Sequence, residues 1–404
     1  MARSLMTSCL ILLFGCQQNQ IESSYSVSDN GIAIINVKVP SSDFPLYHSD
    51  VLDTCILVPL KTTDSVLGEI TDIQYHNGRY YIIDAKVTNK LFVFSESGEF
   101  LFNISNEGQG PGEYQDLRSF VINKSQNTID IFDDFKRQFL RYTLDGEFIK
   151  EIPFELNFTE IQELPDNKYL FYVGKRLNFD ISVDKVDTLQ YDLFTTDGDY
   201  NLTGWQRSFD YSLHNGFKFS LSDHFTQSQG RYFQVPLNDT IFSVSDGGNV
   251  SPSAMINYGG YSKPDLIKKD RYEVSDYLRT NPSAVYFTSQ YFNLKDWITF
   301  DYSFKGKRYY AFVDKNSKEV KTGRPINDYF GFSTYPRLQV KDNLIGTIDP
   351  EALLYFLQSY QQNPDFHLEA KIPKSAMTNL ESIVNEDAEM LYQYLVIMKP
   401  KKSS

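Results

Sequence analysis

A strand-and-turn pattern that occurs twice constrains the fold of this chain more than any other feature of its sequence. Residues 78–100 contain two β-rich runs followed by the turn Gly98-Glu99-Phe100, and residues 128–148 repeat this order up to Gly146-Glu147-Phe148. The two turn glycines are 48 residues apart. A repeating unit of this length, built from short strands and tight turns, is typical of one blade of a β-propeller.

Further units follow along the chain. A third contains the turn Asp197-Gly198, 52 residues after the previous turn glycine, and two more divergent units cover 217–258 and 285–312. The pattern then changes, because residues 350–360 and 375–385 have the spacing of short helices and 392–398 have the composition of a strand.

We therefore predict an all-β fold, a six-bladed β-propeller of four-stranded antiparallel blades with short helices near the C-terminus. The first and last blades of such a ring would expose unpaired edges unless they are joined. An N-terminal strand that closes the last blade solves this problem, and residues 55–60 paired with 392–398 have the composition required. The propeller domain is expected to span residues 29–400.

The N-terminus has the features of an export signal. Arg3 precedes an apolar stretch that is too short to span a bilayer, and Leu13-Phe14-Gly15-Cys16 resembles the bacterial lipobox. On this hypothesis residues 1–16 form a lipoprotein signal that ends at Cys16, the lipidated residue, and the polar segment 17–28 is a tether. An ordinary secretory signal cleaved nearby is the alternative. Lipidation predicts a location in the cell envelope, anchored to the outer membrane and facing either the periplasm or the exterior.

Cysteine content and net charge restrict the role of Cys55 and the kinds of partner that the protein can bind. Cys9 lies in the predicted leader, so Cys55 would be the one unmodified cysteine of the mature chain, and its apolar neighbours predict a buried, inert thiol. The net charge of −13 argues against nucleic acid or an anionic membrane surface as a partner. We expect a monomer that contacts the membrane through its lipid alone.

Several sequence segments together resemble a known family. Residues 58–63, 78–84, 239–242 and 395–397, with the glycine-rich 108–114, resemble the six-bladed β-propeller lipoproteins of unknown function common in Gram-negative gut-type bacteria. The likeness covers residues 54–398 and the blades look like NHL-type repeats. It implies the propeller fold and carries over no catalytic residue.

The glycine-rich segment 108–112 leads to the candidate binding residues. No Gly-Lys-Ser/Thr follows it, so a phosphate loop is not supported, and a tight crossing between blades that needs positive φ explains the glycines. Such crossings lie near the central channel. Glu113, Tyr114 and Arg118 are therefore the predicted residues of the channel mouth.

No catalytic or metal site can be recognised from local motifs. The five histidines, His48, His76, His214, His224 and His367, lack metal-ligand spacing, and there is no Gly-x-Ser-x-Gly motif. Asp130 and Asp133 fall on opposite faces of a strand and match no calcium loop. We predict no cofactor, although calcium in the channel stays open because its ligands would come from different blades.

The function best supported by these features is a binding module for a glycan, peptide or envelope protein at the channel mouth. The alternatives are a metal-dependent propeller enzyme of the lyase or lactonase kind and a structural scaffold without a small ligand. The acidic surface and the lack of a catalytic motif favour the binding module.

Overall fold

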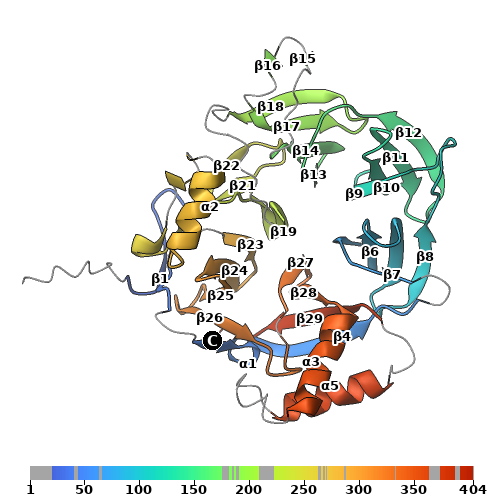
Figure 1. Ribbon diagram of the computed structural model, residues 1–404. Helices are drawn as coiled ribbons and strands as arrows, with labels where there is room; N and C mark the ends of the chain where they lie inside the picture. Colours follow the sequence, from blue (N-terminus) through green and yellow to red (C-terminus); the bar gives the residue numbers. More distant parts are fainter. Residues whose placement is uncertain are drawn as a thin grey trace, which may run out of the picture.

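The computed structural model describes residues 21–403, except for 41–43, 63–65, 175–181, 184–185, 188–190, 209–222, 263–264, 267–268, 270, 286–287, 333, 364–373 and 387–391. Cys16 and the predicted leader lie outside the described residues. Six antiparallel sheets of four strands are arranged in a ring around a central channel, as Figure 1 shows. The predicted six-bladed β-propeller is confirmed.

The first three blades follow one another along the chain, each from its innermost to its outermost strand. Their strands are β5 (Asp72–His76), β6 (Arg79–Asp84), β7 (Lys90–Ser95) and β8 (Phe100–Ile104); β9 (Leu117–Asn123), β10 (Thr128–Asp133), β11 (Gln138–Thr143) and β12 (Phe148–Pro153); and β13 (Glu160–Leu164), β14 (Lys168–Tyr172), β17 (Tyr191–Asp197) and β18 (Leu202–Ser208). A short hairpin, β15 (Ser182–Val183) and β16 (Val186–Asp187), is inserted in the third blade.

The last three blades contain the longer inserts. Their strands are β19 (Phe225–Ser228), β20 (Gly230–Phe233), β21 (Thr240–Val244) and β22 (Val250–Asn257); β23 (Thr288–Asn293), β24 (Trp297–Phe304), β25 (Lys307–Asp314) and β26 (Val320–Ile326); and β27 (Pro336–Val340), β28 (Asn343–Ile348), β29 (Tyr394–Pro400) and β4 (Leu52–Pro59). The inserts hold η3 (Gly259–Tyr261), α2 (Arg271–Thr280), α3 (Pro350–Gln362) and α5 (Lys374–Glu386). The two C-terminal helices were expected from the sequence.

The repeated Gly-Glu-Phe turns join the third and fourth strands of their blades. Gly98 and Gly146 both have positive φ, +83° and +88°, which glycine adopts without strain. In the third blade the turn was predicted at Asp197-Gly198, but the left-handed residue is Tyr200, with φ of +66°. The stacked rings of Phe139 and Tyr169 hold Tyr200 in this conformation.

The apolar core is divided among the interfaces between blades. Separate clusters of buried residues lie between blades 1 and 2, 2 and 3, 3 and 4, 4 and 5, 5 and 6, and 6 and 1. Helices α3 and α5 cover the cluster between blades 5 and 6. Many of the aromatic residues of the chain lie in these clusters, because aromatic side chains fit the half-buried faces of packed strands.

The N-terminal segment surrounds half of the ring. We call its elements the N-terminal belt: β1 (Ser24–Val27), β2 (Ala33–Asn36), β3 (Pro45–Tyr47), α1 (His48–Val51) and β4. Strand β2 pairs in parallel with β22 of blade 4, and β3 pairs in parallel with β26 of blade 5. The segment predicted to be a tether thus includes β1, which is antiparallel to β2. The belt covers two exposed edges before β4 enters blade 6.

Strand β4 closes the propeller as predicted. It pairs with β29 in a register that places Cys55 opposite Met398 and Pro59 opposite Tyr394. Cys55 is buried, as expected, and burial raises the pKa of its thiol to about 12, so it stays protonated.

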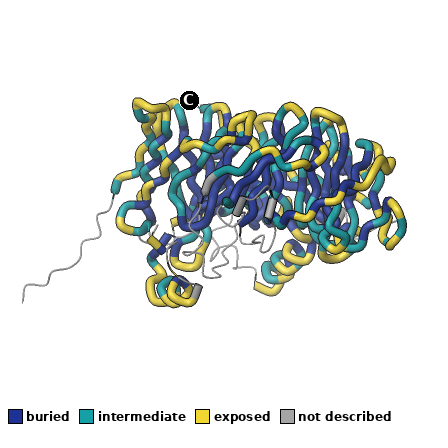
Figure 2. The backbone as a smooth tube through the Cα atoms, turned by 90° about the horizontal axis from the view of Figure 1, so that it is seen from above, coloured by how far each residue is buried: buried dark blue, intermediate teal, exposed yellow. Residues whose placement is uncertain are grey.

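The two faces of the ring differ in what they carry. The first strand of each blade starts at one end of the channel, so the connections from second to third strand, and from each blade to the next, lie on the same end. We call this end the mouth face. Helices α2, α3 and α5 belong to such connections. Figure 2 shows a buried band between two exposed faces. Among the described helices, none has the length and hydropathy needed to cross a membrane.

His48 in the belt makes stability depend on pH. Both of its ring nitrogens are buried without a hydrogen-bond partner among the described residues, and burial lowers its pKa to about 4, against the opposing charge of Asp328. Below pH 6.5 the unfolded chain binds a proton at this site and the folded protein does not, so the stabilising contribution is lost between pH 6.5 and about 4. At pH 4.5 this loss is about 2–3 kcal/mol.

Replacing His48 by leucine removes this dependence. We expect His48→Leu to lie within about 1 kcal/mol of the parent at pH 7.5 and to be more stable than it by about 2–3 kcal/mol at pH 4.5. Urea unfolding at several pH values measures the difference, and comparison of the two proteins cancels the titration of all other groups. Parallel curves for the two proteins would show that His48 does not titrate as described.

Candidate functional site

The channel contains a polar cavity of about 480 Å³. The first strands of blades 1, 2, 3, 4 and 6 line it, and among the described residues blade 5 contributes none. The reason is the position of β19, which lies against both β23 and β27. Strand β23 is also irregular, because its register shifts between Ser289 and Phe292 and Gln290 has φ of +52°.

Charged side chains converge at the mouth of this cavity. Each belongs to the start of a first strand, or to the residues just before it, and each comes from a different blade. We call this set the charged ring: Asp72, Arg118, Glu160, Asp223 and Arg337. Blade 5 reaches the ring through Gln290, whose Nε2 lies 3.4 Å from Oδ2 of Asp223.

The two arginines of the ring connect neighbouring blades. Arg337 of blade 6 donates through Nη1 and Nη2 to the carbonyl oxygens of Ile70 and Thr71, at 2.8 and 2.7 Å. Arg118 of blade 2 pairs with Asp134 at 3.3 Å and donates to the carbonyl of Phe158, which leads into blade 3. Their positive charges are therefore held in place beside the carboxylates.

Three carboxyl groups lie beside these two guanidinium groups in the charged ring. Glu160 accepts hydrogen bonds from the backbone N–H groups of His224 and Phe225, at 2.6 and 2.9 Å. Burial, and then the charges of Asp223 and Asp72, nevertheless hold the pKa of Glu160 well above its usual range. Burial also raises the pKa of Asp72 to about 6, despite the opposing charge of Arg337. The ring thus retains protons at pH values where exposed carboxylates have lost them.

The remainder of the cavity is also polar. Gln74 of β5 bonds to the backbone of β9, donating to Phe120 O at 2.9 Å and accepting from Ile122 N at 3.1 Å. At the end away from the mouth, Lys124 of blade 2 donates to Gln227 of blade 4 at 2.9 Å, so this bond crosses the channel past blade 3. A ligand that enters from the mouth therefore reaches the charged ring without passing this bond.

The three residues predicted from the glycine-rich crossing have different positions. Arg118 belongs to the charged ring. Tyr114 is fully buried, and its hydroxyl donates to the carbonyls of Asn89 and Ile104. Glu113 accepts from the N–H of Gly110 at 2.7 Å and thereby supports the crossing itself. Gly112 in this loop has φ of +73°, as the crossing was predicted to need.

The candidate metal ligands do not gather at one point. Among the described residues, no group of three or more His, Cys, Asp or Glu side chains could hold a metal ion. His224 is buried and its Nδ1 lies 3.0 Å from the carbonyl oxygen of Gln234, while His214 and His367 lie outside the described residues. Asp130 and Asp133 have separate structural roles, since Asp133 accepts hydrogen bonds from four backbone N–H groups.

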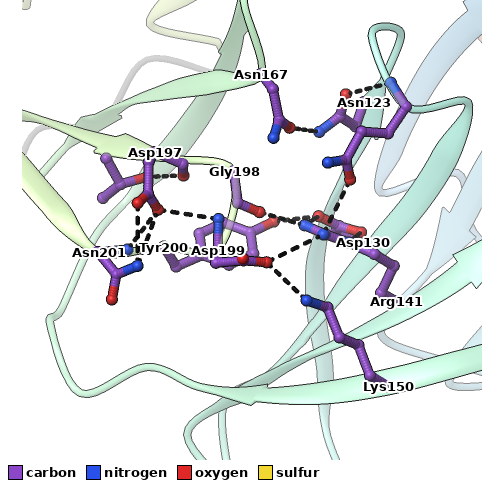
Figure 3. A network of polar contacts seen from close by, with 12 residues as sticks. Asn123, Asp130, Arg141, Lys150, Asn167, Asp197, Gly198, Asp199, Tyr200 and Asn201 are labelled. Carbon is purple, nitrogen blue, oxygen red and sulfur yellow. Dashed lines mark hydrogen bonds and ion pairs between the residues drawn. The ribbon is translucent and has the colours of Figure 1, made fainter.

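Asp130 belongs to a buried network between blades 2 and 3, shown in Figure 3. Arg141 binds both oxygens of Asp130 at 2.8 and 2.7 Å and donates to the carbonyl of Gly198. The hydroxyls of Tyr169 and Tyr200 donate to the same carboxylate at 2.8 and 2.7 Å. Every charge in this buried pair is satisfied, so the network holds the blades together and leaves no group for a ligand.

A comparison with known families agrees with this architecture. The model of a domain of unknown function, DUF4934, matches residues 32–392. The chain belongs to the DUF4934 family. The predicted resemblance to propeller proteins of unknown function is thereby confirmed, and no curated protein matches the chain.

Two solved structures similar to this DUF4934 protein come from Bacteroides species. A candidate exported protein of Bacteroides fragilis has a TM-score of 0.68 and 19% identity, covering 91% of this chain and 100% of its own. A DUF4221 family member from Bacteroides vulgatus has a TM-score of 0.49 and 10% identity, covering 88% and 98%. The first likeness supports the shared fold.

Sequence reasoning missed four members of the charged ring in this DUF4934 protein. Asp72, Glu160, Asp223 and Arg337 are separated by dozens of residues and form no local motif. An alignment of the repeats could have identified these residues, because they lie at or near the start of the first strand of their blades. A charged residue at that position in successive blades points toward the channel mouth.

Proposed function

We propose that this DUF4934 protein is an exported, lipid-anchored binding module that takes a polar ligand into the channel cavity from the mouth face. The observation that carries the proposal is the cavity of about 480 Å³, whose mouth holds the charged ring. Small-molecule sites commonly have volumes of about 300–1,000 Å³ and a few convergent polar groups. Carboxylates and guanidinium groups side by side can accept and donate hydrogen bonds to one ligand.

Two further observations support the location. The lipobox-like segment ending at Cys16 favours lipidation after export, and the similar protein of Bacteroides fragilis is a candidate exported protein. Anchoring through Cys16 would place the propeller in the cell envelope, on the outer membrane. The segment after Cys16 would then connect the lipid to the belt.

A substitution that fills the cavity tests this function. Ser119 on β9 lines the cavity, and its hydroxyl has no hydrogen-bond partner among the described residues. Ser119→Trp would therefore remove no hydrogen bond, and its larger side chain at the cavity wall would narrow the site. Because the Ser119 hydroxyl is itself buried, the urea unfolding midpoint of the variant is measured first. Ser97 lies exposed in a turn at the opposite end of blade 1, so Ser97→Trp is the matched control.

The measurement is a thermal-shift series with oligosaccharides and short peptides as probes. A probe at 100 times its Kd should raise the melting temperature of the parent and of Ser97→Trp by about 3 °C, and leave Ser119→Trp unchanged. A probe that stabilises all three proteins equally would bind outside the channel. Such a result would contradict the proposed site.

A further inference from the structure

The exposed apolar side chains of this protein are distributed unevenly between the two faces. Large hydrophobic residues with high exposure occur in five connections of the mouth face: Val66 (72%), Val87 (65%), Phe135 (70%), Tyr272 (79%) and Tyr355 (74%). The other exposed residues of this kind lie on the outer strands or in the belt. Among the described residues, the turns of the opposite face contain none.

The five residues lie in connections of blades 1, 2 and 6 and in the connection between blades 4 and 5. Val66 and Val87 belong to the connections before and within blade 1, Phe135 lies in blade 2, and Tyr272 and Tyr355 lie on α2 and α3. Figure 1 shows these two helices on different sides of the channel. Aromatic residues are enriched at surfaces that bind other polypeptides, where they supply most of the apolar contact.

Charge and hydrogen-bonding capacity favour one kind of occupant. The charged ring holds three carboxyl groups and two guanidinium groups, and both guanidinium groups already donate to backbone carbonyls. The net charge of the chain is −13, so a second copy or an anionic lipid surface would be repelled. The carboxyl oxygens of the ring can accept hydrogen bonds from the lysine or arginine of a polypeptide.

We propose that the mouth face binds an extended polypeptide segment, with a basic side chain in the charged ring and apolar neighbours on the exposed residues around it. This inference rests on the proposed function and names its ligand class. A segment of twelve residues reaches about 40 Å when extended, enough to contact residues on more than one blade.

The test uses three synthetic dodecapeptides and the purified protein. One has a central lysine with flanking phenylalanine and leucine, the second has glutamate in place of lysine, and the third has serine in place of the apolar flanks. We expect the lysine peptide to bind at least about tenfold more tightly than either other peptide. Equal affinities, or no binding of the lysine peptide, would overturn the inference.

Protein variants test whether the peptide binds to the mouth face or to another part of the surface. Phe135→Ser and Tyr355→Ser should each weaken binding of the lysine peptide by about tenfold. Leu101→Ser removes an exposed residue of the outer strand β8 and should change affinity by less than about twofold. Asp72→Asn, which keeps the shape of the side chain, should reduce the preference for lysine over glutamate.

The remaining outcomes distinguish this inference from the proposed function. If an oligosaccharide binds and Ser119→Trp blocks it, while the lysine peptide does not bind, the proposed function stands and the inference fails. Self-association that Phe135→Ser abolishes would assign the face to a second copy and would also overturn the inference.

Discussion

Replacing Arg141 by methionine is expected to lower the free energy of unfolding by about 3–5 kcal/mol. The side chain of Asp130 is completely buried, and Arg141 supplies the one positive charge that binds both of its oxygens. Without the guanidinium group the carboxylate would keep the hydroxyls of Tyr169 and Tyr200 but lose its counter-charge. An unpaired charge in such a site is among the most destabilising defects in a folded protein.

A nearby exposed ion pair provides the control. Lys150 binds Asp199 at 2.7 Å at the edge of the same network, where both side chains are about half exposed. Lys150→Met should change the free energy of unfolding by less than about 1 kcal/mol. Urea unfolding of both variants gives the comparison, and similar values for the two would mean that the buried pair contributes no more than a surface pair. The double variant Asp130→Leu with Arg141→Met should recover part of the loss, because it removes both charges.

Replacing Gly98 by alanine is expected to destabilise the junction between the first and last blades. A Cβ atom on Gly98 would lie 2.1 Å from the carbonyl oxygen of Pro59, the last residue of β4, and the backbone there cannot easily move. The N–H of Lys61 also donates to the carbonyl of Gly98 at 2.9 Å. The turn of blade 1 therefore sits directly against the end of the closing strand.

Gly78 separates the steric effect from backbone strain. It has φ of +76°, similar to Gly98, but a Cβ atom there would have no neighbour within 4 Å. Gly78→Ala should destabilise by about 1 kcal/mol through strain alone, and Gly98→Ala by about 2–3 kcal/mol more. Equal urea midpoints for the two variants would show that the closing strand adjusts freely. Limited proteolysis of the segment after β4 would locate the opening.

The fold could be predicted to a large extent because each blade has local signals. The Gly98 and Gly146 turns mark the spacing, and the pairing of the segments around Cys55 and Met398 follows from the need to protect edges. The position of the left-handed residue in blade 3 was harder to predict, because a tyrosine occupies it instead of a glycine. Tyr200 is held there by the ring of Tyr169 in its own blade and by the ring of Phe139 and the carboxylate of Asp130 in blade 2, which no local pattern indicates.

Features that join distant segments could not be predicted in the same way. The parallel pairing of β2 with β22 connects Ala33 to Ala254, and short parallel strands leave no turn between them to mark their register. The charged ring could not be predicted either, because its side chains come together only when the propeller closes. In blade 5 the predicted unit began at Val285, residues 286–287 lie outside the described residues, and β23 begins at Thr288. The bulge near Gln290 disturbs the alternation of this strand.

The N-terminal belt determines the order in which the ring can be completed as the chain emerges N-terminus first. Ala33, Pro45 and Cys55 emerge early, whereas their partners Ala254, Arg324 and Met398 follow hundreds of residues later. The first strands made are therefore the last to find their places, and contacts of such long sequence separation form slowly. Until β29 has been made, the nascent protein is an open arc with an unpaired belt at one end, which is the form most exposed to aggregation and most dependent on chaperones.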